Sequence, residues 1–134
     1  MPSTLKPPTP RCTAAVFAEQ ITFDQQTGFT SLLNVFSRMK VPGEPGQSGP
    51  FGLHVQLTDG LGDYEIAAEL HDLDGEGPLA RVAFPVRLSD RLEKAAVNFP
   101  FTPVTYPRFG RYDLVVTANG APVMELTIDV EPLG

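Results

Sequence analysis

The acidic segment at residues 72–76 has the residue types and spacing closest to those of a binding site. Asp72, Asp74 and Glu76 alternate around Gly75 and resemble the start of a calcium-binding loop. Calcium requires roughly six to eight oxygen ligands, and such loops usually close with a bidentate carboxylate. The sequence returns to apolar residues at Leu79 without that later glutamate. We expect a plain acidic turn, and calcium binding is the alternative.

A second acidic pair, Asp59 and Asp63, could in principle complete such a site. In an up-and-down arrangement, however, consecutive turns lie at opposite ends of a sandwich. The two clusters would then be a strand length apart, about 20 Å. We therefore predict no metal site and no cofactor site.

The two histidines, His54 and His71, are the other candidate metal ligands. Both fall on the polar phase of consecutive predicted strands, so we expect both to face solvent. Antiparallel pairing about the turn at residues 59–62 places His54 opposite Ala67, roughly four residues from His71. The sequence therefore predicts two ordinary exposed histidines and no shared metal site.

The sequence has no arrangement typical of nucleophilic catalysis. The Gly-x-Ser-x-Gly motif is absent, and Cys12, the single cysteine, has no histidine near it in sequence. Gly60-Leu-Gly62 and Gly75-Glu-Gly77 are too short for phosphate loops and do not open a helix. No deep cleft for a pair of glycosidase carboxylates is indicated. We predict that the protein is not an enzyme and has no catalytic residues.

The overall charge restricts the class of partner. The formal net charge is −6, and the ten lysines and arginines are scattered along the chain. Binding to phosphate groups requires clustered basic residues, so we expect neither nucleic acid nor an anionic membrane as a partner. The single cysteine excludes an intramolecular disulfide. Neither a secretion signal nor an apolar run of about 18 residues is apparent. These features predict a cytoplasmic protein.

Short strands are the elements that must position these residues. The fourteen prolines and twelve glycines of this 134-residue chain lie mostly between apolar runs, which is typical of strands joined by turns. Asn119-Gly120 predicts a tight turn inside a hairpin over Phe109–Val130. On its buried face, alternation predicts Tyr112, Leu114, Val116, Ala118, Leu126, Ile128 and Val130.

Alternation predicts six further strands before that hairpin. They cover Thr13–Thr22, Phe29–Val41, Phe51–Thr58, Tyr64–Leu70, Val82–Leu88 and Ala95–Phe101. A helix over Phe29–Val41 is an alternative, and Arg91–Lys94 is expected to form a short helical turn. Pro85 predicts an edge position for its strand, because proline cannot donate to a sheet ladder. Residues 1–10 are expected to form a flexible lead-in, and residues 11–134 a single all-β antiparallel sandwich of about seven to eight strands.

Two groups of motifs resemble known families. Pro107-Arg-Phe-Gly-Arg-Tyr112 resembles the entry to the penultimate strand of an immunoglobulin-like sandwich, where a tyrosine corner lies. The second group resembles an uncharacterised bacterial family of small immunoglobulin-like domains. It consists of Phe23–Gly28, Ser31–Arg38, Asp72–Gly75 and the entry to the last strand pair through Gly110-Arg-Tyr112. The likeness covers most of residues 12–131. It implies a fold and no activity.

These observations favour a non-enzymatic interaction or structural module, whose partner is another protein or a second copy. Sheet edges are one candidate surface. The closing hairpin is another, because Val115 and Val123 are outward and roughly opposite each other. The alternative function is binding of carbohydrate or calcium by end loops, for which Tyr106, in a loop, is the free tyrosine. Tyr112 is expected to be buried, with its hydroxyl bonded to backbone in the preceding loop.

Overall fold

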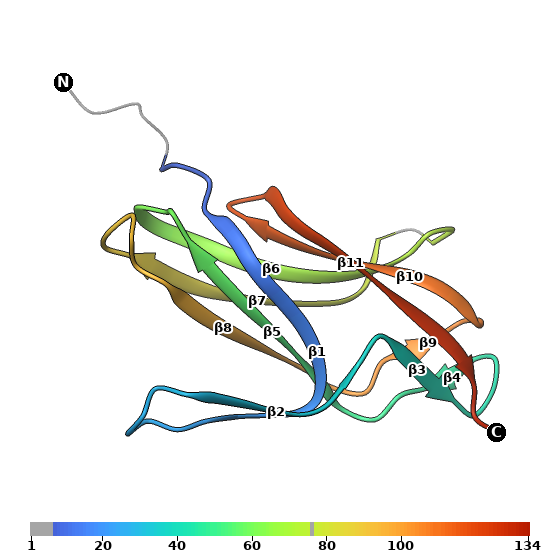
Figure 1. Ribbon diagram of the computed structural model, residues 1–134. Helices are drawn as coiled ribbons and strands as arrows, with labels where there is room; N and C mark the ends of the chain where they lie inside the picture. Colours follow the sequence, from blue (N-terminus) through green and yellow to red (C-terminus); the bar gives the residue numbers. More distant parts are fainter. Residues whose placement is uncertain (1–6, 76) are drawn as a thin grey trace.

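The computed structural model describes residues 7–75 and 77–134, and those residues form strands and loops without a helix (Figure 1). No segment of this part can therefore cross a membrane as a helix. The strands are β1 (Arg11–Phe23), β2 (Thr30–Phe36), β3 (Arg38–Val41), β4 (Gly46–Gln47), β5 (Phe51–Thr58), β6 (Gly62–Asp72), β7 (Pro78–Leu88), β8 (Ala95–Phe101), β9 (Thr105–Tyr106), β10 (Gly110–Ala118) and β11 (Ala121–Pro132).

The number and bounds of the strands differ in part from the sequence prediction. Eleven strands replace the predicted seven to eight, partly because two of them, β4 and β9, are only two residues long and lie in predicted loops. The predicted strand over Phe29–Val41 is two strands, β2 and β3, which belong to different sheets. The predicted helical turn at Arg91–Lys94 is wrong. Arg91 and Leu92 form a turn outside any helix, in which the Glu93 amide donates to the Asp90 carbonyl.

Two sheets form the sandwich. The first has the order β2-β1-β5-β8, and the second has the order β3-β11-β10-β6-β7. All pairings within them are antiparallel except that of β3 with β11. Because β5 and β6 are consecutive but lie in opposite sheets, the chain does not follow the predicted up-and-down path. In an immunoglobulin sandwich, strands B and E pair in one sheet and C, F and G lie side by side in the other. The same arrangement is present here: β5 and β8 are adjacent in the first sheet, and β6, β10 and β11 lie side by side in the second.

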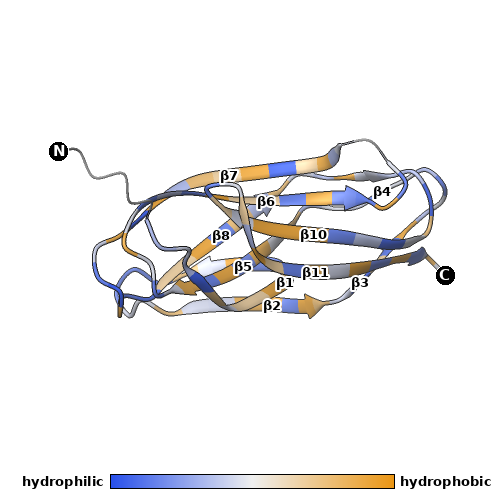
Figure 2. Ribbon diagram, turned by 90° about the horizontal axis from the view of Figure 1, so that it is seen from above, coloured by the Kyte–Doolittle hydropathy of each residue, from blue (hydrophilic) through white to orange (hydrophobic). Residues whose placement is uncertain are grey.

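Alternating apolar residues build the core between the sheets, and Figure 2 shows the hydropathy of each residue along the strands. The central strands β5, β6 and β10 direct every second side chain inward, as their period of two requires. Fully buried side chains include Leu53, Val55, Leu57, Ile66, Leu70, Leu114, Val116 and Ile128. The predicted inward faces of these three strands are therefore confirmed.

The closing hairpin is confirmed as β10 and β11. Asn119 and Gly120 have φ angles of 49° and 85°. These angles are the left-handed conformation that this tight turn requires. A bulge between Val116 and Thr117 shifts the register, so that Val115 lies opposite Glu125. The prediction that Val115 and Val123 face each other is therefore wrong, and Val123 packs against the core.

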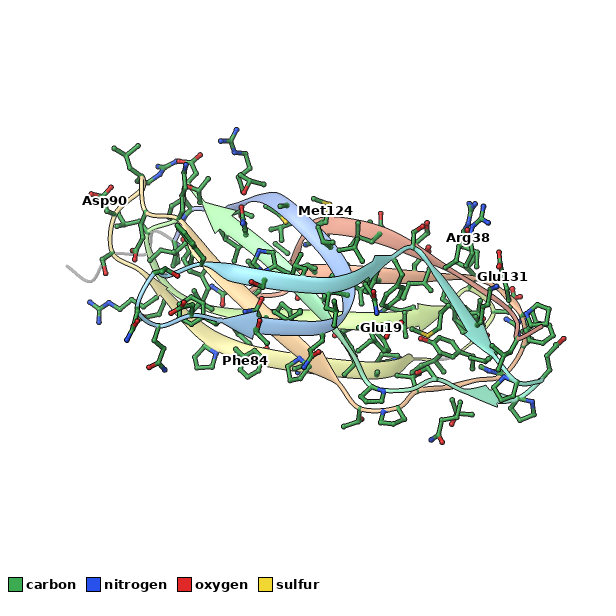
Figure 3. The ribbon with its side chains drawn as sticks, turned by 60° about the horizontal axis from the view of Figure 1, so that its bottom comes forward. Glu19, Arg38, Phe84, Asp90, Met124 and Glu131 are labelled. Carbon is green, nitrogen blue, oxygen red and sulfur yellow. The ribbon has the colours of Figure 1, made fainter. Side chains whose placement is uncertain are left out.

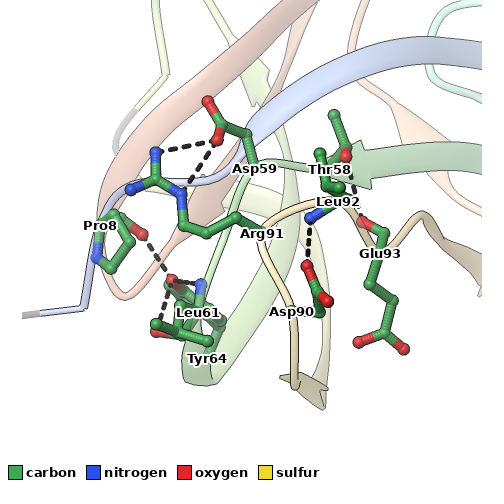
Figure 4. Close-up of polar contacts among 9 residues, drawn as sticks. All are labelled: Pro8, Thr58, Asp59, Leu61, Tyr64, Asp90, Arg91, Leu92 and Glu93. Atoms are coloured by element: carbon green, nitrogen blue, oxygen red, sulfur yellow. Dashed lines mark hydrogen bonds and ion pairs between the residues drawn. The ribbon is translucent and has the colours of Figure 1, made fainter.

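Polar contacts close one end of the sandwich (Figure 4). The Tyr64 hydroxyl donates to the carbonyl of Pro8 and accepts from the Leu61 amide at 2.8 Å. Arg91 Nη2 lies 2.8 Å from Asp59 Oδ1. These contacts attach the chain ahead of β1 and the loops after β5 and β7 to one another. Residues 1–6 of the predicted lead-in lie outside the described residues.

Candidate interaction surface

The acidic turn between β6 and β7 is neutralised by an arginine. Asp72 is buried, and its carboxylate accepts from the Asp74 amide at 3.2 Å and from the guanidinium of Arg108. Arg108 Nη2 also lies 3.1 Å from Asp74 Oδ2. The guanidinium therefore lies where a cation would have to bind. Glu76, the third predicted member, lies outside the described residues.

We expect millimolar calcium to leave the melting temperature of the protein unchanged. A ligand that binds only the native state raises the melting temperature by mass action, and Arg108 already provides the counter-charge of Asp72 and Asp74. Differential scanning fluorimetry with and without calcium checks this, with magnesium as the control cation. A calcium-dependent rise that Asp74→Ala abolishes would contradict the structural role of this turn.

The histidines are not on neighbouring strands. His54 lies on β5 in the first sheet and His71 on β6 in the second. His54 is also buried, contrary to prediction, because β5 is a central strand with neighbours on both sides. Its Nδ1 lies 2.7 Å from Asn98 Oδ1 on β8, and its Nε2 lies 3.2 Å from Gln56 Nε2. Within the described residues, no group of three or more histidine, cysteine or acidic side chains is placed to hold a metal.

Two other candidate groups are buried rather than available. Tyr106 is fully buried, contrary to the prediction of a free loop tyrosine, and contacts the Tyr112 ring edge-on at a centroid distance of 5.0 Å. Its hydroxyl has no hydrogen-bond partner among the described residues, and desolvation raises the pKa of this phenol well above its usual range. Burial likewise raises the pKa of the Cys12 thiol, which opposes formation of the reactive thiolate.

The feature that stands apart from the sandwich is a two-stranded extension, which we call the hairpin arm (residues 19–36). Strand β1 pairs with β5 only as far as Ala18, whereas its pairing with β2 continues to Phe23. The second half of β1 and the Thr30–Leu33 part of β2 therefore form a ribbon of two strands, whereas Val35 and Phe36 pair with the part of β1 that β5 also flanks. Figure 1 shows this ribbon diverging from the first sheet, with its turn far from the sandwich.

A bend at the root separates the arm from the sheet. Asn34 has a φ angle of 57° in the middle of β2, a conformation that asparagine tolerates better than most other side chains with a Cβ. Its Nδ2 lies 3.4 Å from Oε2 of Glu19 on the opposite strand, which is labelled in Figure 3. Beyond the bend, Ile21 packs on Gly52 of β5, where a Cβ would lie only 2.7 Å from Ile21 Cδ1. The glycine therefore permits this contact.

The arm carries a concentration of exposed apolar side chains. The exposed fractions are 56% for Phe23, 72% for Phe29, 55% for Leu33 and 60% for Val35. In the described part of the chain, nine large hydrophobic residues are exposed, and these four belong to one hairpin. A groove of about 300 Å³ is lined by the arm at Glu19–Ile21 together with residues of β5 and β8. The exposed apolar surface of this protein is therefore centred on the arm.

The free edge of β2 differs from the other edges of the two large sheets. The edge strand β7 contains Pro85, which confirms the predicted edge position, and β8 contains Pro100. Strand β3 is four residues long and contains Arg38 and Lys40. Proline, charge and short length all oppose pairing with a further strand. Strand β2, with the sequence TSLLNVF, has neither proline nor charge and is seven residues long.

Sequence reasoning located β2 but not its exposed surface. The signal was the presence of apolar residues on both phases, since Leu32 and Leu33 are adjacent and so are Val35 and Phe36. A strand on the face of a sandwich needs only one apolar phase. Two apolar phases in an edge strand indicate either a fully buried strand or a surface that another molecule covers.

The fold and the tyrosine corner define the class of this protein. The Tyr112 hydroxyl donates to the Arg108 carbonyl at 2.6 Å and accepts from the Arg108 amide at 3.2 Å. This is the arrangement predicted for the start of strand F. The protein is an immunoglobulin-like β-sandwich. It belongs to the family of unknown function DUF6941, whose model matches residues 13–131.

Comparisons with individual proteins add one solved structure. An immunoglobulin-like protein of Pseudomonas aeruginosa is similar at 16% sequence identity, with a TM-score of 0.44. The similarity covers 97% of this chain and 100% of that one. No curated protein matches the chain.

Proposed function

We propose that this protein is a non-enzymatic interaction module that binds a protein partner through the hairpin arm. The observation that carries the proposal is the exposure of Phe23, Phe29, Leu33 and Val35 on the hairpin arm, most of which is a ribbon of only two strands. An isolated two-stranded ribbon is marginally stable in water and needs a third strand or a packed face. A partner that covers the arm would supply both.

The partner is expected to add a strand to the free edge of β2. In this mode, main-chain hydrogen bonds hold an extended segment against a sheet edge, and pockets select its side chains. The lack of charge and proline on β2 supports this edge over the others.

The non-enzymatic part of the proposal is supported by the state of the candidate reactive groups. Asp72 is paired with Arg108, the pKa of Cys12 is raised, and the two histidines lie in separate sheets. These states support a non-enzymatic role, because they disfavour Asp72 as a base, Cys12 as a nucleophile and the two histidines as a shared metal site.

The proposal is tested by affinity capture with three forms of the tagged protein. The arm variant carries Leu33→Lys and Val35→Lys, and a matched control carries Thr117→Lys and Thr127→Lys on the outer face of the second sheet. We expect proteins that the wild type and the control retain to be absent from the arm variant. Circular dichroism and melting temperatures verify that all three forms are folded. Retention of the same proteins by all three would contradict the proposal.

A further inference from the structure

We propose that the strand added at β2 is β2 of a second copy of this chain. The two copies would be related by a two-fold axis, with their β2 strands antiparallel, so that two four-stranded sheets join into one of eight strands. The inference rests on the proposed function, since it names the partner of the same edge. Strand β2 ends the first sheet, and Figure 1 shows the arm diverging from the sandwich.

Charge and proline together select this edge for self-association. Each copy has a formal net charge of −6, so two copies repel each other, and an interface without ionisable side chains adds least to that repulsion. The edge strands β2 and β8 contain no ionisable side chain, whereas β7 contains Arg81 and Arg87, and β3 contains Arg38 and Lys40. Of the two neutral edges, β8 contains Pro100, which opposes strand pairing, so β2 is the edge at which the two copies meet.

The acidic group on the neighbouring strand is Glu19 of β1, whose Oε2 lies 3.4 Å from Asn34 Nδ2 on β2. In the paired form, three inter-strand spacings, about 14 Å in all, would separate the main chain at Glu19 from that of its copy. The Asn34 amide provides this carboxylate with a hydrogen-bond donor within its own copy.

The residues of β2 are also self-complementary. Leu33 is the central residue of Thr30–Phe36, so a two-fold axis at the middle of the strand places Leu33 opposite its own copy. Directly opposed side chains on antiparallel strands lie about 5 Å apart and contribute favourably when both are apolar. Val35 falls opposite Ser31 in the same register. The contact covers Leu33 and Val35, which are two of the exposed apolar side chains of the arm.

The oligomeric state is measured by multi-angle light scattering and sedimentation over a concentration series at physiological salt. We expect the wild type to dimerise with increasing concentration. Leu33→Lys should raise the dissociation constant by about tenfold or more, because two like charges would be directly opposed. Thr127→Lys adds the same charge on the outer face of the second sheet, and we expect it to leave the dissociation constant unchanged.

A charge pair tests the register. Leu33→Glu should also dissociate the dimer, and an equimolar mixture of Leu33→Lys and Leu33→Glu should form mixed dimers, which excludes unfolding as the cause. A wild type that is monomeric up to millimolar concentration overturns the inference, as does a dimer that these substitutions do not weaken. Failure of the mixture to associate contradicts the axis at Leu33. If the wild type is monomeric but the arm variant still loses its captured proteins, self-pairing is wrong and the interaction function stands.

Discussion

Arg108→Ala is expected to lower the free energy of unfolding by about 3 kcal/mol, because it leaves the carboxylate of Asp72 buried without a counter-charge. The Asp72 side chain is 6% exposed, and its remaining partner is the amide of Asp74. The pair also connects the turn after β6 to the loop before β10. Urea denaturation measures the loss. The value lies at the low end for a broken buried pair because the Arg108 side chain is partly exposed.

Two further variants separate charge burial from loss of side-chain contacts. Arg111→Ala removes an exposed arginine whose Nε lies 3.7 Å from Asp129 Oδ1. For this exposed pair we expect a change within about 0.5 kcal/mol. The double variant Arg108→Ala with Asp72→Asn leaves no charge buried and should be more stable than Arg108→Ala alone. Equal losses for Arg108→Ala and Arg111→Ala would show that the pair does not stabilise the fold.

The same substitution at two contacting tyrosines is expected to have opposite effects. Tyr112→Phe removes two hydrogen bonds to the Arg108 backbone. It should therefore destabilise the protein by about 2 kcal/mol. Tyr106→Phe removes a buried hydroxyl that has no partner, and it should stabilise the protein by about 1 kcal/mol. Denaturant midpoints of the two variants and the wild type give the comparison. A loss of stability in Tyr106→Phe would indicate that this hydroxyl is hydrogen-bonded after all.

Local pattern and long-range pairing explain which parts of the fold could be predicted. The β10–β11 hairpin was predictable because Asn119-Gly120 determines the turn and alternation determines the buried face. The bulge after Val116 was not predictable, because no residue type marks it, and this bulge moved Val123 away from Val115. The assignment of β5 and β6 to opposite sheets depends on pairings between distant segments, which periodicity does not encode.

The candidate surface was less predictable than the fold. The apolar residues of β2 were assigned to a strand, but their exposure follows from where β1 leaves β5, at Ala18. Likewise, the position of His54 within its own strand and of Tyr106 within its own loop predicts that both side chains are exposed. Both lie against segments that are distant in sequence, since His54 contacts Asn98 on β8 and Tyr106 pairs with Gly46 on β4.

The parallel pairing of β3 with β11 has a consequence for the order of folding. Arg38 and Asp129 are paired in this ladder, although they are far apart in the sequence. Closing so long a loop costs more chain entropy than forming the local β10–β11 hairpin or the β6–β7 pair. We therefore expect the β3 edge to form late on the folding pathway, after the hairpins that surround it. Until that step, the outer edge of β11 at Asp129–Pro132 stays open to newly made chains, and this stage is where misassembly would compete most strongly with folding.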